Sequence, residues 1–518
     1  MMRKITILWT DDEIDLLMPH ILFLKEKGYE VITASNGEDA IQTVQTKNID
    51  LIFLDENMPG ISGLETLNQI KTLNPAIPVV MITKSEEENI MDEALGSKID
   101  DYLIKPVNPK QILLSIKKNI DTKRLITQKT TSAYQAEFAR ISLLINTAQN
   151  FTDWVEIYKK LTYWDLEIGT GSDSGLHEIL KMQKADANKG FSRFIKSNYI
   201  GWFYEKAADK PLMSQNVFAR KVFPYLSNGA KVCVVLIDNL RLDQWRSILP
   251  FIEESYRLES EELFCSILPT ATQYARNAMF AGLMPMEIEE MFPELWPKEN
   301  EEGGKNLLED QLLEKQIQRY GIRTKTRYEK INNSRAGKKL LDNINNLLNF
   351  DLSVVVFNFV DILSHARTDI EMIKELAWDE SAFRSLTLSW LQHSHLLEFI
   401  RELAVYRVKL VITTDHGTVR VNNPLRVVGD RNTTTNTRYK QGKNLNYNPE
   451  EVFEIKKPAE IHLPKSHISS TYIFAMDYDF FVYPNNYNQF VNYYRNTFQH
   501  GGISMEEMLV PVSVLNPI

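Results

Sequence analysis

In the N-terminal part of the sequence, acidic and other polar residues follow short apolar runs that have the composition of buried strands. Asp11 and Asp12 follow ITILWT, and Asp55 ends LIFLD. Further along, Thr83 ends VVMIT and Lys105 ends DYLIK. In a doubly wound parallel sheet the carboxyl ends of the strands line one crevice, so we expect these side chains to converge.

These residue types in one crevice predict phosphoryl transfer to a carboxylate. Three carboxylates around one point need a cation, and hard oxygen ligands favour Mg²⁺. Asp55 would be the nucleophile that forms an acyl phosphate. Lys105 would be the counter-ion of the phosphoryl group, and the Thr83 hydroxyl would move to bond it. Any one acid at a strand end is normally a solvated loop residue, but the whole set in this order favours a phosphorylation site.

The C-terminal part repeats the pattern with a different set of ligands. Asp238 ends KVCVVLID, Asp361 ends VVVFNFVD, and Asp415 follows VKLVITT. The strand-end rule again predicts one shared cleft. His365 comes four residues after Asp361, so both side chains would lie on one side of a helical turn.

Two more histidines complete this second set. His416 follows Asp415 directly, and His500 precedes two glycines that would let the backbone come close to a metal or a phosphate. A lone histidine is more often a hydrogen-bonded loop residue than a ligand. Carboxylates and imidazoles together, without thiolates, are the ligands of hydrolytic zinc, with manganese as the alternative.

The apolar pattern along the chain predicts the elements that position these residues. Residues 1–120 alternate strand-like and amphipathic runs, which is typical of a doubly wound five-stranded α/β domain. Residues 121–220 have only helical patterns, so we expect a helical connector. Residues 221–518 contain nearly continuous apolar runs that are typical of strands buried on both faces, and we expect an α/β domain with a mainly parallel central sheet.

Composition excludes several classes of protein. Only Cys233 and Cys265 are present, so neither a disulfide framework nor a cysteine-rich zinc module is available. No run approaches the ~20 apolar residues of a membrane span, and we expect a cytoplasmic protein without membrane insertion. The net charge of −9 argues against a protein that wraps duplex DNA. The basic segment 417–449 could still dock an anion.

The first set of residues resembles the receiver domain of two-component response regulators over about residues 1–120. The matching pieces are the acidic pair at Asp11, the D-x-N-M-P-G run that begins at Asp55, Thr83, and Lys105 followed by proline. This resemblance implies phosphorylation by a sensor histidine kinase. It also implies that the backbone carbonyl of Asn57 binds Mg²⁺ together with the three acids, and that Tyr102 is an aromatic switch residue.

The second set resembles the alkaline phosphatase superfamily, in its PglZ-type branch, over about residues 230 to 518. The run PTAT with a later glycine matches the family motif in which the last threonine is the nucleophile, here Thr272. The resemblance implies two zinc ions, one held by Asp238, Asp415, His416 and Thr272, and the other by Asp361, His365 and His500. Weaker expectations are substrate contacts from Asn239, Asn277, Arg438 and Lys440.

The order of receiver, helical connector and PglZ-type domain resembles a family of response regulators associated with type IX secretion and gliding. This resemblance covers the full chain. It implies zinc-dependent cleavage of phosphodiesters in cyclic or linear oligonucleotides, contact with a sigma factor, and a homodimer on phosphorylation.

Two other classes of function remain open. In a transcription regulator, residues 121–220 would bind DNA, but their excess of basic residues is slight and we find no turn-flanked recognition helix. In a signalling scaffold, for example one that binds a sigma factor, zinc would only stabilise the fold. Metal analysis with an assay on a generic phosphodiester would separate these classes from an enzyme.

Overall fold

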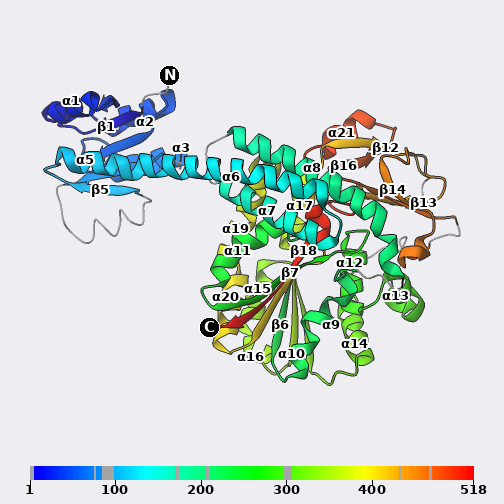
Figure 1. Cartoon of the computed structure of the whole chain (residues 1–518). Coiled ribbons are helices and arrows are strands. Elements are labelled where there is room, and N and C mark those ends of the chain that lie inside the picture. Colours follow the sequence, from blue (N-terminus) through cyan, green and yellow to red (C-terminus); the bar gives the residue numbers. More distant parts are fainter. Residues whose placement is uncertain are drawn as a thin grey trace. The chain divides into compact units, whose positions relative to one another are not determined.

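Figure 1 shows the computed structural model of the chain. The structure describes residues 5–74, 77–83, 99–169, 174–204, 210–296, 306–430, 433–465 and 469–518, without the side chains of 120–130, 174, 369 and 371. It forms two compact units, Met1–Gln135 and Ala136–Ile518, and each is described by itself.

The first unit contains a parallel five-stranded sheet with the order β2-β1-β3-β4-β5. The strands are β1 (Thr6–Thr10), β2 (Glu30–Ala34), β3 (Leu51–Asp55), β4 (Val79–Thr83) and β5 (Asp101–Ile104). The helices around it are α1 (Met18–Glu26), α2 (Gly37–Thr46), α3 (Gly63–Leu73) and α5 (Pro109–Ile116). The doubly wound fold predicted from the alternating pattern is confirmed.

Alternating side chains of the strands fill two cores, one on each face of this sheet. Trp9 packs with the α1 and α5 side, whereas its neighbour Leu8 packs with the α2 and α3 side. Because both faces are covered, the strands are apolar throughout rather than alternating with polar residues. The strand order reverses between β1 and β3, which places the crevice at the carboxyl ends of these two strands.

Three long helices follow: α6 (Thr122–Thr147), α7 (Phe151–Gly169) and α8 (Ser174–Asn198). Trp154 of α7 is buried and meets Phe191 of α8 edge-on, with ring centroids 5.8 Å apart. Gly190 makes this close packing feasible, since a Cβ at that position would lie 2.6 Å from the Trp154 ring. The helical character expected for the connector is confirmed in the described residues. Residues from 136 onward belong to the same compact unit as the C-terminal domain.

The second unit is built on a six-stranded sheet with the order β7-β18-β10-β6-β9-β8. Its strands are β6 (Val232–Ile237), β7 (Tyr256–Cys265), β8 (Thr326–Ile331), β9 (Leu352–Phe357), β10 (Lys409–Thr413) and β18 (Leu509–Pro517). Strands β8, β9, β6 and β10 pair in parallel, and β18 is antiparallel to both β10 and β7. The mainly parallel sheet is therefore confirmed.

The helices of this unit include α12, which carries Thr272, and α17, which carries Asp361. Between α8 and the inserted lobe described next, the helices are α9 (Val217–Lys221), α10 (Phe223–Ser227), α11 (Leu242–Ile252), α12 (Thr272–Ala281), α13 (Pro285–Met291), α14 (Glu309–Arg319), α15 (Ser334–Asp342), α16 (Ile344–Leu347), α17 (Phe359–Asp369), α18 (Glu371–Leu376), α19 (Glu380–His393) and α20 (His395–Val405). No helix in the described ranges is long and apolar enough to cross a membrane.

A smaller lobe is inserted between β10 and β18. It contains β11 (Val419–Arg420), β12 (Asn423–Arg426), β13 (Tyr439–Gly442), β14 (Val452–Ile455), β15 (Thr471–Ala475), β16 (Asp479–Val482), α21 (Tyr487–Tyr494), β17 (Phe498–Gln499) and α22 (Met505–Met508). The antiparallel pair β11 and β17 brings the two ends of this insertion together.

Candidate functional sites

The crevice of the first unit contains the predicted acids and the lysine. Lys105 Nζ lies 2.9 Å from Asp11 Oδ2 and 3.0 Å from Asp55 Oδ2. Asp11, Asp12 and Asp55 each offer an oxygen within 4.8 Å of the others. Asp11 and Asp55 are buried, whereas Asp12 is exposed. One cation among three carboxylates leaves negative charge uncompensated, which suits a Mg²⁺ ion.

Burial and the neighbouring charges shift the pKa values of Asp55 and Lys105 in opposite directions. Burial raises the pKa of Asp55, and the hydrogen bond from Lys105 only partly offsets it. Burial alone would lower the pKa of Lys105, but its contacts with Asp11 and Asp55 outweigh burial and raise it. The lysine is therefore a firmly held cation at the site where a phosphoryl group would arrive.

The remaining receiver residues lie around this crevice. Thr83 ends β4 and is buried, and Asn57 is exposed in the loop after β3. Tyr102 on β5 is 43% exposed, as a side chain that changes its orientation requires. Gly63 allows the loop to pack against Asp55, because a Cβ there would lie 2.2 Å from the Asp55 carbonyl oxygen. The roles of these residues stay predictions.

In the second unit, the predicted zinc ligands form two clusters. Asp238, Asp415 and His416 have ligand atoms within 4.8 Å of one another, and so do Asp361, His365 and His500. Asp238 directly follows β6, and Asp415 lies two residues beyond β10.

The expectation that Asp361 ends a strand was wrong. Strand β9 stops at Phe357, and Asp361 lies in the first turn of α17. On this helix His365 is one turn later, and its Nε2 lies 3.5 Å from Asp361 Oδ1. The apolar pattern continues past β9 because Val360, in the first turn of α17, is buried as well.

The two clusters adjoin each other through their histidines. The rings of His416 and His500 stack with centroids 4.3 Å apart and an interplanar angle of 19°. His500 Nε2 also lies 3.8 Å from Asp361 Oδ1. The pairing of Val419 with Gln499 in β11 and β17 holds these histidines side by side although they are far apart in the sequence.

Hydrogen bonds fix the tautomers of both stacked histidines. His416 Nδ1 donates to the Gly417 carbonyl and His500 Nδ1 to the Thr270 carbonyl, each at 3.1 Å. Since a carbonyl only accepts, the neutral ring keeps its lone pair on Nε2. Burial lowers the pKa of His500 well below its usual value, which favours the neutral form. An Nδ1–H bonded to a carbonyl, with the lone pair on Nε2, is the usual arrangement of a metal-binding histidine.

The carboxylates of the first cluster fit a metal as well. Asp238 Oδ1 is buried and has no hydrogen-bond partner among the described residues. Burial would raise the pKa of Asp415, but Arg276 and His416 outweigh burial and hold it at about 2. A buried carboxylate oxygen without a partner is costly unless a cation binds it.

Thr272 is the first residue of α12, and its hydroxyl lies 3.1 Å from His416 Nε2. The preceding threonine of the PTAT run has a different task. Thr270 Oγ1 donates to the Gly502 carbonyl at 3.0 Å and accepts from Gly501 N at 3.0 Å. Thr270 therefore secures the loop that carries His500, while Thr272 faces the ligands.

The two asparagines expected to contact substrate are both buried. Asn239 lies between the clusters: its backbone N–H donates to Asp415 at 3.4 Å and its side-chain amide to Ser364 at 3.2 Å. Asn277 lies on α12 and is 2% exposed. Both are near the site, and a direct contact with substrate stays a prediction.

The expectation that Arg438 and Lys440 clamp the substrate is not supported. Arg438 is completely buried, and its guanidinium donates to Glu507 and to the carbonyls of Met476, Asp479 and Ile503. Lys440 is 2% exposed, donates to the Thr434 carbonyl, and lies over the Tyr483 ring. Burial lowers the pKa of Lys440 to about 7. Both buried side chains hold the inserted lobe together, so the basic segment 417–449 is not one continuous anion-binding surface. Arg431 lies outside the described residues.

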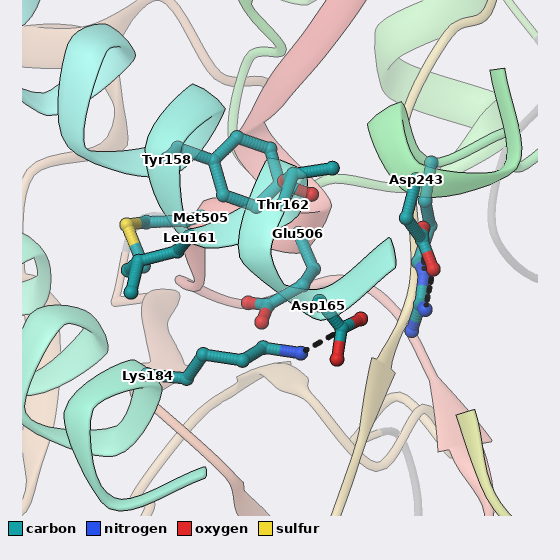
Figure 2. A pocket seen from close by; sticks show the side chains of 9 residues that line it. Tyr158, Leu161, Thr162, Asp165, Lys184, Asp243, Met505 and Glu506 are labelled. Atoms are coloured by element: carbon teal, nitrogen blue, oxygen red, sulfur yellow. Dashed lines mark hydrogen bonds and ion pairs between the residues drawn. The ribbon is translucent and has the colours of Figure 1, made fainter. Parts of the chain in front are cut away.

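A buried ionic cluster between the connector helices and the sheet domain was not expected. Figure 2 shows Lys184 of α8 pointing toward Asp165 of α7, beside Glu506 of α22. Lys184 also lies 2.6 Å from Glu380. The cavity beside these residues is about 10 Å³, roughly the space of one water molecule. The sequence contains one indication of this ionic cluster, because polar residues recur every four positions along α8.

Comparison with known proteins shows which families the domains that carry these sites belong to. The model of the BREX system PglZ alkaline phosphatase-like domain matches residues 217–515, more than half of the chain. The chain belongs to the PglZ family. Ahead of the PglZ domain, the response regulator receiver domain matches residues 7–117 and the PorX response regulator linker domain matches residues 124–203. This is the PorX-like architecture, and the resemblances seen in the sequence are confirmed.

Curated relatives of this PglZ protein match shorter stretches. The transcriptional regulatory protein ZraR of Klebsiella oxytoca is 35% identical over 27% of the chain and 31% of its own length. The cyclic di-GMP phosphodiesterase of Thermotoga maritima is 32% identical over 39% of the chain and 49% of its own length. The chain spans about a third to a half of the length of these relatives.

Two solved structures of response regulators match part of the chain. A CheY-like receiver from Methanospirillum hungatei has 28% identity, covers 23% of the chain and 96% of its own, and has a TM-score of 0.23. TrrA from Thermotoga maritima, in complex with Mg²⁺ and BeF, has 32% identity, covers 22% of the chain and 97% of its own, and has a TM-score of 0.21.

Proposed function

We propose that this PglZ protein is a response regulator phosphorylated on Asp55, whose output is a zinc-dependent phosphodiesterase with Thr272 as nucleophile. The main support for the proposal is the position of the Thr272 hydroxyl, which lies 3.1 Å from His416 Nε2. His416 belongs to one ligand cluster and stacks on His500 of the other. A nucleophile at the junction of two metal clusters is the arrangement of a two-metal phosphohydrolase.

The two clusters define how zinc would be held. One ion would bind Asp238, Asp415, His416 and Thr272, and the other would bind Asp361, His365 and His500. Oxygen and imidazole donors suit hydrolytic zinc, and His365, 63% exposed, lies at the open side of the site. When bound, zinc supplies Lewis acidity that lowers the pKa of a coordinated hydroxyl and polarises phosphoryl oxygens.

The chain's own residues then perform a double displacement. Thr272 Oγ loses its proton and forms a bond to phosphorus as the bond from phosphorus to the first ester oxygen breaks. That oxygen takes up a proton and leaves as an alcohol, and the threonine carries the rest of the substrate through a phosphodiester bond. Water breaks the threonine–phosphate bond in the second step and restores the hydroxyl. Because Thr272 begins α12, the positive end of the helix dipole lies where negative charge develops on the phosphoryl group.

A diester is the substrate class that the charges favour. A monoester dianion calls for a free cation beside the metals, but Arg276 is completely buried and bound to acids of the protein. A diester carries one negative charge and needs no such clamp. The name of the Thermotoga maritima relative, a cyclic di-GMP phosphodiesterase, makes cyclic dinucleotides the first natural substrates to test.

The experiment compares three substrates with zinc-loaded protein: p-nitrophenyl phosphate, its bis-ester, and cyclic di-GMP. We expect the diesters to be cleaved faster than the monoester. Faster cleavage of the monoester would overturn the diester assignment. Zinc without cleavage of any substrate would favour the scaffold function instead.

The receiver implies a sensor histidine kinase as phosphodonor. We further propose, from the PorX-like architecture, a role in regulating type IX secretion, contact with a sigma factor, a cytoplasmic location, and a homodimer on phosphorylation.

A further inference from the structure

Arg276 lies one helical turn after Thr272 on α12 and is completely buried. A buried guanidinium requires partners, because an unpaired charge in the interior strongly destabilises the fold. Its partners here are acids that the metal site also uses.

The guanidinium binds both carboxylates of the first ligand cluster. Nη2 is paired with Asp238 Oδ2, and Nε donates to Asp415 Oδ2 at 3.0 Å. The buried arginine therefore bridges the two carboxylates that follow β6 and β10.

One consequence concerns the orientation of Asp238. Since Arg276 takes Oδ2, the other oxygen, Oδ1, is buried and has no hydrogen bond to any residue that the structure describes; it lies 3.9 Å from His416 Nε2. This is the arrangement of a carboxylate that offers one oxygen to a metal and is held by its second oxygen.

Arg276 is itself held in place from the opposite side. Its Nη1 lies 3.4 Å from Glu309 Oε1 and 3.4 Å from Asn358 Oδ1. Glu309 is buried and also binds Lys330, at 3.2 Å, and the Tyr328 hydroxyl. With these anchors the guanidinium cannot turn toward the substrate without losing several charge-assisted hydrogen bonds.

We propose that Arg276 is a positioning residue for one zinc ion: it orients Asp238 and Asp415 and offsets part of their charge, without touching substrate. The inference rests on the proposed two-zinc function. Arg276 acts on the cluster of Asp238, Asp415 and His416. It has no role at the cluster of Asp361, His365 and His500. Lysine cannot replace it, because a single ammonium does not span two carboxylates in a fixed geometry.

The test measures zinc affinity in the full-length protein by competition with a chelator, for wild type, Arg276→Lys and Arg276→Gln. Loss of an outer partner typically weakens metal binding by about 10- to 100-fold. We expect one of the two ions to be weakened to this extent in both variants, while the other keeps its wild-type affinity. Excess zinc should restore part of the activity.

Arg384→Gln is the matched control. Arg384 is also a buried arginine that binds two carboxylates, Asp165 at 3.1 Å and Asp243 at 2.9 Å, and neither is a predicted zinc ligand. This variant should lose stability and keep both zinc affinities. If Arg276 only stabilised the fold, the two arginine variants would behave alike.

The outcomes separate the inference from the proposed function. Wild-type protein that binds no zinc would overturn the proposed function. Wild-type protein with two zinc ions, together with unchanged affinities in Arg276→Gln, would overturn the role of Arg276 alone. Should both Arg276 variants fail to fold, Glu309→Gln removes the anchor instead; it should weaken the same ion, and unchanged zinc binding would contradict the inference.

Discussion

At the scale of single residues, the second metal cluster depends on His500. Its Nδ1 hydrogen bond to Thr270 leaves Nε2 directed at Asp361. We expect His500→Ala to lower the zinc content from about two ions per chain toward about one, because an ion that loses one of three protein ligands is poorly held. Elemental analysis of the purified variants would measure this. Asp361→Ala should give the same result, and full zinc content in both variants would contradict the ligand assignment.

Lys440 leads to a prediction about pH. The neutral amine is favoured in the folded protein, so unfolding takes up a proton between the folded pKa of about 7 and the ordinary lysine value of 10.5. Stability from this group therefore rises with pH across that window. We expect Lys440→Met to stabilise the protein by more than about 1 kcal/mol at pH 6 and by less at pH 9. Thermal unfolding at both pH values checks this, and an equal change at both would refute it.

Residue types could be predicted from sequence better than residue environments. The strand-end rule found Asp238 and Asp415 because the polypeptide itself dictates where a buried strand stops. Arg438 and Lys440 were weak assignments from the basic segment 417–449, and their burial could not be predicted because a charge in the sequence does not show whether its side chain faces solvent or the interior. The partners of Arg276 come from four separate segments, and only the fold brings these together.

At the scale of elements, helix α8 binds the sheet domain through one polar stripe. Lys184, Asn188, Ser192 and Lys196 are four residues apart, and they contact Glu380, the Met505–Glu506 segment, Asp477 and the Val452 carbonyl, respectively. Residues at this spacing lie on one face of a helix. The sequence predicted the helix, but the use of this face required the structure.

Asn188 is the most informative member of the stripe. It is buried, accepts from Met505 N at 2.8 Å and donates to Glu506 Oε2 at 2.8 Å. Asn188→Ala leaves both groups without this partner, and we expect a loss of about 1 to 3 kcal/mol in the free energy of unfolding. Chemical denaturation measures it. Lys181→Ala on the exposed side of α8 serves as control, and an equal loss there would show that the stripe has no special role.

At the scale of the whole molecule, the fold classes of both units could be predicted because alternating strands and helices leave a strong apolar pattern. The division into 1–120, 121–220 and 221–518 stays a prediction. Residues from 136 onward form one compact unit with the PglZ domain. The reason is physical: α7 and α8 bury charged groups against α19 and α22, and helical periodicity alone does not show such contacts.

The expected effect of phosphorylation concerns the whole molecule, because it is a change of oligomeric state. With Mg²⁺, acetyl phosphate should add one phosphoryl group at Asp55, and beryllofluoride should shift the protein toward a dimer. The physical reason is that a receiver has two conformational states. New charge on Asp55, beside Lys105, shifts the equilibrium between them. Intact mass and light scattering check the two parts. No added mass in the wild type, or an equal shift in Asp55→Ala, would contradict the prediction.

The most direct test of the central claim is the rate of cleavage of bis-p-nitrophenyl phosphate by zinc-loaded Thr272→Ala. A methyl group cannot attack phosphorus, so we predict a loss of at least about 1000-fold, with zinc content and fold retained. Thr272→Ser keeps the hydroxyl and should keep a measurable part of the rate. If Thr272→Ala instead retains most of the wild-type rate, Thr272 is not the nucleophile and the proposed mechanism is wrong.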